Sequence, residues 1–138
     1  NPARLRGLHR VIALLDTNAF LRWVEGDDRL SAKAKSCIAN PDNEILVSVV
    51  VAWELAIKSG QGGIKLAQPV GRYVASHIEA NGFRLLGIEL DDMAAIETLP
   101  LHHRDPFDRL LVAQAKNRKL PVVSSDRAFS DYGIKRIW

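Results

Sequence analysis

The sequence predicts an α/β fold with a parallel sheet of about five strands, because short apolar runs alternate with helical stretches along the chain. The expected strands cover residues 11–15, 45–48, 84–89, 121–124 and 134–138. Strands that alternate with helices are typical of parallel sheets joined by right-handed crossovers. In such sheets, ligands bind beyond the carboxyl ends of the strands.

The helices between these strands are bounded by residues that commonly start or end a helix. Thr17 or Asn18 can cap the first helix, and Ser31 can cap the second, which is expected to end at Asn40. Two further helices are expected at residues 70–81 and 91–99. The first of these two carries an apolar stripe with helical spacing and is followed by glycine.

The composition is that of a single globular domain, which we expect to span residues 11–138. The chain has 138 residues, of which 47% are apolar and 25% charged. No apolar run approaches the roughly 20 residues of a membrane span. Cys37 is the only cysteine, which excludes an internal disulfide and favours a reducing, cytoplasmic compartment. Residues 1–10 are basic and irregular, and we expect either a native extension or a cloning remnant.

Four apolar runs stop at, or lead into, a carboxylate. These acids are Asp16, Glu54, Asp108 and Asp126. Acids are rarely placed beside core segments unless something pairs with them, and four acids brought together would repel one another. A hard divalent cation would take up their oxygens. The pattern therefore predicts a carboxylate site for Mg²⁺ or Mn²⁺.

Each acid also has a purely structural interpretation. Glu54 could form an i, i+4 ion pair with Lys58, although its apolar neighbours on the same helical face favour an inward position. Asp16 could cap the helix that follows it, and Asp126 could make a turn. Their shared placement at strand ends favours a common site.

The segment before the last long helix contains two acids with different expected roles. Asp105 is the expected helix cap, followed by proline at the first helical position. Asp108 is expected on the helix face that meets the sheet, where a functional role is favoured. His102 and His103 lack partners at metal-ligand spacing and are expected to be loop residues before this cap. No histidine or lysine is expected to transfer protons in the site.

The net charge is +3, from 19 Lys and Arg residues against 16 Asp and Glu residues. If the four acids hold a cation, the rest of the chain is strongly basic, which suits a polyanionic substrate such as nucleic acid. The candidates for phosphate contact are Arg104, Arg109 and Lys58, although solvated surface charge is the commoner role of such residues.

Four segments of the chain resemble the PIN-domain nucleases, in particular the VapC-type toxins of bacterial and archaeal toxin–antitoxin systems. The matching segments, in the order expected for that family, are residues 14–18, 48–58, 103–115 and 123–129. The third segment, which begins at His103 and contains Asp105 and Asp108, is the most specific. The resemblance extends over residues 11–138.

This resemblance implies a three-layer α/β/α PIN-like fold and a metal-dependent endoribonuclease that leaves 5′-phosphate and 3′-hydroxyl ends. It implies that the four acids form the catalytic, metal-binding site, supported by Thr17, Asn18 and Ser124. A threonine is frequent in the family where this chain has Ser124, which keeps the hydroxyl. The implied partners are RNA, a cognate VapB-like antitoxin and a second copy of the chain.

Two alternatives remain open. A catalytically silent PIN-like module that binds RNA or protein would normally have lost an acid, and all four are present here. An aspartyl-phosphate phosphatase would usually carry a second acid two residues after the first, where this chain has Asn18.

The segment from residue 49 to 78 is rich in apolar helix faces. These faces carry Val50, Trp53, Ile57, Val70, Tyr73, Val74 and Ile78. A small sheet is not expected to cover all of them, and uncovered apolar patches mark interaction sites. The sequence alone leaves open whether this surface is core or interface, and the resemblance favours a groove for the antitoxin.

Overall fold

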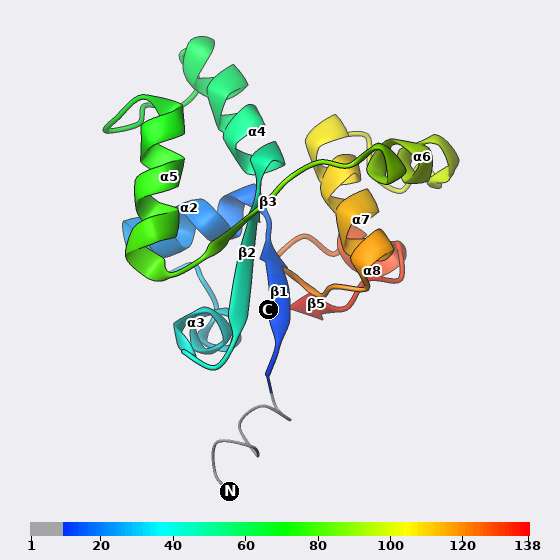
Figure 1. Ribbon diagram of the computed structural model, residues 1–138, viewed down its shortest axis with the longest axis horizontal. Helices are drawn as coiled ribbons and strands as arrows, with labels where there is room; N and C mark the ends of the chain where they lie inside the picture. Colours follow the sequence, from blue (N-terminus) through cyan, green and yellow to red (C-terminus); the bar gives the residue numbers. More distant parts are fainter. Residues whose placement is uncertain (1–9) are drawn as a thin grey trace, which may run out of the picture.

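All five strands of the sheet are parallel, in the order β3-β2-β1-β4-β5 (Figure 1). The computed structural model describes residues 10–138. The strands are β1 (Ile12–Leu15), β2 (Glu44–Ser48), β3 (Arg84–Leu86), β4 (Val122–Val123) and β5 (Arg136–Ile137). The predicted parallel sheet of five strands is confirmed.

Seven helices connect and flank these strands within residues 10–138. They are α2 (Thr17–Glu25), α3 (Ala32–Ala39), α4 (Val49–Gly60), α5 (Val70–Asn81), α6 (Leu90–Thr98), α7 (Pro106–Arg118) and α8 (Ala128–Asp131). In Figure 1, α2, α3 and α5 lie on one side of the sheet, whereas α6, α7 and α8 lie on the other. The α/β/α layers are thus confirmed.

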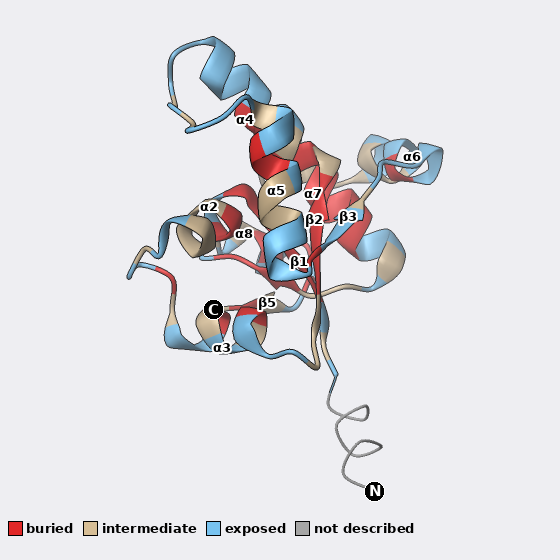
Figure 2. Cartoon of the chain, turned by 60° about the vertical axis from the view of Figure 1, so that its left-hand side comes forward, coloured by how far each residue is buried: buried red, intermediate tan, exposed pale blue. Residues whose placement is uncertain are grey.

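Two apolar clusters, one on each face, hold the layers together. On β1, Ala13 and Leu15 belong to the cluster with α2, α3, α4 and α5, whereas Leu14 packs in the cluster with α7 and α8. This alternation follows from the period of two in a strand, whose successive side chains point to opposite faces. Both faces of β1 are therefore buried, and β1 and β2 lie in the buried centre of Figure 2, whereas β3 at the edge of the sheet is largely exposed.

The strand register places two of the site residues side by side. Leu15 is paired with Val47 of β2 and with Val123 of β4. The residues that follow on β1 and β4 are Asp16 and Ser124, so both lie at the carboxyl edge of the sheet. Helices α2 and α4 also begin at this edge, because each follows directly on its strand.

Two helix starts differ from the first choice made from sequence. Of the three residues considered as the cap of α2, Asp16 is the cap and Thr17 and Asn18 are not, because Oδ1 of Asp16 accepts a hydrogen bond from the backbone N–H of Ala19 at 2.8 Å. Helix α6 begins after Glu89 rather than at Asp91. The Ser31 and Asp105 caps and the helix at residues 70–81 are confirmed.

The third strand is shorter than the predicted range 84–89. It ends at Leu86, and the carbonyl of Gly87 accepts a hydrogen bond from the buried side chain of Gln114 on α7, at 3.0 Å. The backbone beyond Leu86 is thus hydrogen-bonded to a helix instead of to a neighbouring strand.

The expected extension, residues 1–10, lies outside the described residues except for Arg10, which pairs with Glu44. Within residues 10–138, no helix combines the length and the apolar character that crossing a membrane requires.

A candidate acidic metal site at the carboxyl edge of the sheet

The four predicted acids come together at the carboxyl edge of the sheet. Asp16 follows β1, Glu54 lies on α4, Asp108 is in the first turn of α7, and Asp126 follows β4. The charge of Asp126 raises the pKa of Asp16, and the charges of Asp16 and Glu54 raise the pKa of Asp108. Elements far apart in sequence thus deliver four carboxylates to one place.

Asp16 is buried and held at both of its carboxylate oxygens. Only 5% of its surface is exposed. Its Oδ1 caps α2, and its Oδ2 accepts a hydrogen bond from the hydroxyl of Ser124 at 2.5 Å. Burial raises the pKa of Asp16 to about 6, against the opposing effect of its hydrogen bonds to Ser124 and Ala19. The expected supporting role of Ser124 agrees with this contact.

Glu54 has both the inward position and the ion pair with Lys58 that the sequence allowed. It is buried, with its Oε1 accepting a hydrogen bond from the Thr17 hydroxyl at 2.7 Å, and its Oε2 pairs with Lys58. The hydrogen bond to Glu54 raises the pKa of Lys58 above its ordinary value. Thr17 therefore orients Glu54, and Lys58 serves as the partner of an acid rather than as a free cation for phosphate.

The pKa of Asp108 is raised further than that of Asp16. Burial first, and then the negative charge of Asp105, raise its pKa to about 7. Asp105 caps α7, because its Oδ1 accepts hydrogen bonds from the backbone N–H groups of Phe107 at 2.8 Å and Asp108 at 3.1 Å. The Oδ1 atom of Asp105 is thus a helix cap, as the sequence favoured.

His103 belongs to the site, and its interpretation as an ordinary loop residue is wrong. Its Nε2 atom lies 3.0 Å from Oδ2 of Asp126 and 3.1 Å from Oδ2 of Asp108. These three side chains offer ligand atoms within 4.8 Å of one another. Residue spacing gave no sign of this, because His103 reaches Asp126 only through the fold. The one available signal was its position at the start of the most specific matching segment.

The remaining polar candidates lie at the rim of the site or away from it. Asn18 is exposed in the first turn of α2, and Arg104 is exposed before α7. The guanidinium of Arg109 donates hydrogen bonds to the backbone carbonyls of Leu99, Pro100 and His103. Arg109 therefore holds the loop before α7 and is not retained as a phosphate contact.

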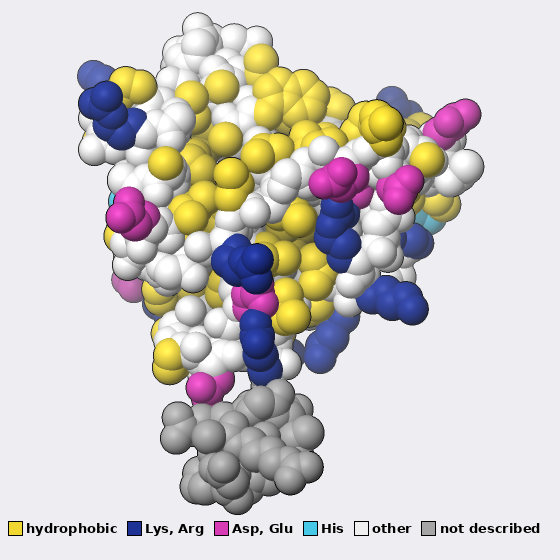
Figure 3. Space-filling view, in the orientation of Figure 1, with side chains coloured by type: hydrophobic (Ala, Val, Ile, Leu, Met, Phe, Trp, Pro, Cys, Tyr) yellow, Lys and Arg dark blue, Asp and Glu magenta, His cyan; other side chains and the backbone are white. Residues whose placement is uncertain are grey.

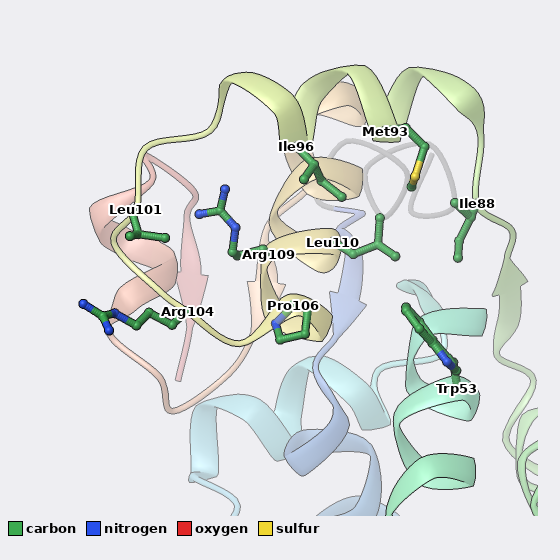
Figure 4. Close-up of a pocket in the computed structure, with 9 residues that line it drawn as sticks. All are labelled: Trp53, Ile88, Met93, Ile96, Leu101, Arg104, Pro106, Arg109 and Leu110. Carbon is green, nitrogen blue, oxygen red and sulfur yellow. The ribbon is translucent and has the colours of Figure 1, made fainter.

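An open groove lined by apolar side chains lies beside the site, between α4, α6 and α7. We call it the apolar groove. It has a volume of about 850 Å³. Its lining includes Trp53, Ile88, Met93, Ile96 and Leu101, which face a common space in Figure 4. Trp53 is 48% exposed and Leu101 is 69% exposed. Figure 3 shows hydrophobic side chains gathered over the region between α4 and α6.

Most of the apolar residues expected to be uncovered between 49 and 78 are in fact packed. Val50, Tyr73 and Val74 are buried in the core, and Val70 and Ile78 pack against it. Trp53 and Ile57 remain exposed, because they point away from the sheet on α4. The uncovered surface therefore extends from α4 towards α6 and not along α5.

The donor atoms of this site fit a hard divalent cation. Carboxylate oxygens are the ligands that Mg²⁺ and Mn²⁺ prefer. The raised pKa values of Asp16 and Asp108 reflect burial and mutual repulsion, which a bound cation would relieve.

The comparisons with known proteins support the same fold. A chain of the VapBC2 complex from Rickettsia felis, solved bound to a promoter DNA fragment, superposes with a TM-score of 0.65 and 14% identity, over 91% of this chain and 97% of that one. A chain of FitAcB from Neisseria gonorrhoeae gives 0.57 and 18%, over 91% and 96%.

A third solved structure, VapBC-5 from Mycobacterium tuberculosis, described as a member of the VapBC family of toxin–antitoxin systems, gives a TM-score of 0.56 and 20% identity, over 92% of this chain and 98% of that one. No curated protein sequence matches this chain. The sequence model of the PIN domain matches residues 13–135, a range that starts within β1, includes β2, β3 and β4, and ends directly before β5. Sheet, acids and family model agree, and the chain belongs to the PIN domain family.

Proposed function

We propose that this protein is a metal-dependent endoribonuclease that acts as the toxin of a toxin–antitoxin system. One observation carries the proposal: Asp16, Glu54, Asp108 and Asp126, from four separate elements, converge where a parallel sheet binds its ligands. Buried, mutually repelling acids are costly to a fold, and they are retained where they serve a site.

The four carboxylates would hold Mg²⁺ or Mn²⁺. When bound, such an ion supplies Lewis acidity and lowers the pKa of a water molecule for attack on a phosphodiester. The hydroxyls of Ser124 and Thr17 hold Asp16 and Glu54 in fixed orientations for this purpose. Burial of these acids excludes bulk water and strengthens every charge interaction in the site.

RNA is the proposed substrate, hydrolysed to 5′-phosphate and 3′-hydroxyl ends. The net positive charge of the chain suits a polyanion, and a single strand or loop can present its backbone to a carboxylate floor. Arg104 is the remaining candidate for phosphate contact, because it is exposed, whereas Arg109 and Lys58 are engaged within the protein.

The proposed partners are an antitoxin and a second copy of this chain. The similar solved structures are described as VapBC and toxin–antitoxin complexes, which supports an antitoxin as a partner. We propose that the antitoxin places a basic side chain against the acidic site and so blocks it. The apolar groove supports a homodimer, because interfaces between permanent partners are more hydrophobic than transient ones.

Cleavage of a structured RNA by purified protein tests the proposal. We expect cleavage with Mg²⁺ or Mn²⁺ and none with a chelator. Asp16→Asn keeps the volume but loses the charge, so activity should fall more than about 100-fold, because even outer partners of a metal site contribute about 10–100-fold. Asp28→Asn, at a fully exposed acid, is the matched control.

Full activity of Asp16→Asn would contradict the four-acid site. A wild-type protein that binds metal but cleaves no RNA would favour the catalytically silent module. A separate experiment tests the toxin role. Co-expression with the product of the adjacent upstream gene should give a stable complex that does not cleave RNA.

A further inference from the structure

His103 lies on the loop between α6 and α7, and two side chains fix the backbone of this loop. The hydroxyl of Tyr132 accepts hydrogen bonds from the backbone N–H groups of His102 at 3.1 Å and His103 at 3.0 Å. Arg109 donates to the carbonyl of His103 and to the hydroxyl of Tyr132. Tyr132 is buried, with 4% of its surface exposed. Tyr132 and Arg109 therefore fix the backbone of this loop.

The hydrogen bonds of the imidazole assign its tautomer. The backbone N–H of Asp105 donates to Nδ1 of His103 at 3.0 Å, so Nδ1 carries a lone pair and the proton is on Nε2. The Nε2–H group lies between Oδ2 of Asp126 and Oδ2 of Asp108. His103 thus forms a hydrogen bond with Asp126, and its Nε2 atom also lies within ion-pair distance of Asp108 on a different element.

We propose that His103 is a positioning residue that holds Asp108 and Asp126 at the spacing a divalent cation needs, and that it is not itself a ligand. This inference rests on the proposed metal-dependent function. A ligand role would need the lone pair on Nε2 and the proton on Nδ1, where it would meet the N–H of Asp105. Asp105 thereby sets the orientation of His103 in addition to capping α7.

The physical need for such a residue follows from where the two acids lie. Asp108 is fixed to α7, whereas Asp126 is on the loop after β4, and like charges drive the two apart. A donor placed between them opposes this repulsion before any cation arrives. Outer partners that orient metal ligands commonly contribute about 10–100-fold to metal affinity.

Direct metal binding tests the inference. Mn²⁺ affinity is measured from the electron paramagnetic resonance signal of free Mn²⁺, and Mg²⁺ affinity by competition, for wild type, His103→Ala and His103→Gln. We expect His103→Ala to weaken the binding of Mn²⁺ and of Mg²⁺ by a similar factor of at least about ten. His103→Gln should bind nearly as wild type, because its amide N–H can replace the Nε2 donor. His102→Ala, on the same loop, is the control.

Other outcomes overturn the inference in recognisable ways. Unchanged affinity in His103→Ala would remove the positioning role, and tighter binding would mean that the imidazole occupies the cation position. Equal losses in the Ala and Gln variants, larger for Mn²⁺ than for Mg²⁺, would make His103 a ligand. A wild-type protein that binds neither ion would contradict the proposed function itself. Thermal unfolding without metal shows whether each variant is folded.

Discussion

Asp16 uses its two carboxylate oxygens for different tasks. Oδ1 caps α2 through the N–H of Ala19, and Oδ2 accepts the hydroxyl of Ser124 from the neighbouring strand. A carboxylate that is held at both oxygens loses less entropy when it binds a cation than a freely rotating one. The local helix start thus preorganises the site residue.

Protonation of Asp16 and Asp108 predicts an unusual pH dependence of stability in the metal-free protein. Folding raises their pKa values from 3.8 to about 6 and about 7. The folded state therefore holds protons that the unfolded state has released, so stability is highest below pH 4 to 5 for these groups and is lost as pH rises through 7. With a chelator, the free energy of unfolding should fall by roughly 4 kcal/mol between pH 5 and pH 8, because the two pKa values lie about one and two units above pH 5 and each unit corresponds to about 1.4 kcal/mol.

Urea unfolding at both pH values provides the measurement, and Asp108→Asn provides the control. The variant should be more stable than wild type at pH 8 and less dependent on pH, because its side chain cannot ionise. Added Mg²⁺ should raise the wild-type melting temperature at pH 8, since it binds only the folded site. Identical pH profiles for the two proteins would show that ionisation of Asp108 does not destabilise the folded state.

Asp16, Asp108 and Asp126 could be proposed from sequence because each stands close to a strand end or a helix start that is itself readable, and Glu54 because of its apolar neighbours in sequence. His103 could not. Its role depends on a loop fixed by Tyr132, about 30 residues further along, and on an imidazole turned by the N–H of Asp105. The competing interpretations of Asp16 and Glu54 were also not exclusive, since each acid has two oxygens and uses them separately.

At the scale of elements, hydrogen bonds from two side chains hold the loop before α7. The hydroxyl of Tyr132 accepts from two backbone N–H groups and from Arg109, and Arg109 also donates to the carbonyl of His103. One side chain from the region after α8 thereby joins the loop to α7. The position of His103 depends in part on the hydroxyl of Tyr132.

Tyr132→Phe should therefore cost about 1–3 kcal/mol of unfolding free energy, because buried donors lose their acceptor. Tyr73→Phe is a matched control: Tyr73 is also buried, and its hydroxyl has no hydrogen-bond partner among residues 10–138. Chemical denaturation of both variants gives the comparison. Equal stability losses would mean that the hydroxyl of Tyr132 does not anchor the loop.

The element boundaries show where sequence reasoning stops. The existence of five strands and their parallel direction follow from apolar runs that alternate with helices and from crossover rules, whereas the strand order is known only from the structure. The early end of β3 does not, because it depends on a hydrogen bond between Gly87 and Gln114 that forms only after α7 has packed. Cap positions likewise depend on which of several adjacent polar side chains faces the helix N-terminus.

At the scale of the whole molecule, the apolar groove leaves the large apolar side chains of Trp53, Ile88 and Leu101 uncovered. If it forms a homodimer, Leu101→Asp should shift the protein towards monomer, because a charge would be buried at the interface. Leu90→Asp, at a leucine that is 86% exposed and does not line the groove, should not. Analytical ultracentrifugation over a range of concentrations measures the change. A wild-type monomer at all concentrations would contradict the dimer.

The hydrogen bond from Ser124 to Asp16 joins residues 108 positions apart, and it has a consequence for how the protein is made. The ribosome releases β1 before β4, and Ser124 emerges 108 residues after Asp16. Until then Asp16 has no Ser124 and His103 has no Asp126. A chain interrupted before β4 therefore lacks a complete acidic site, and the proposed nuclease activity requires synthesis to pass Asp126.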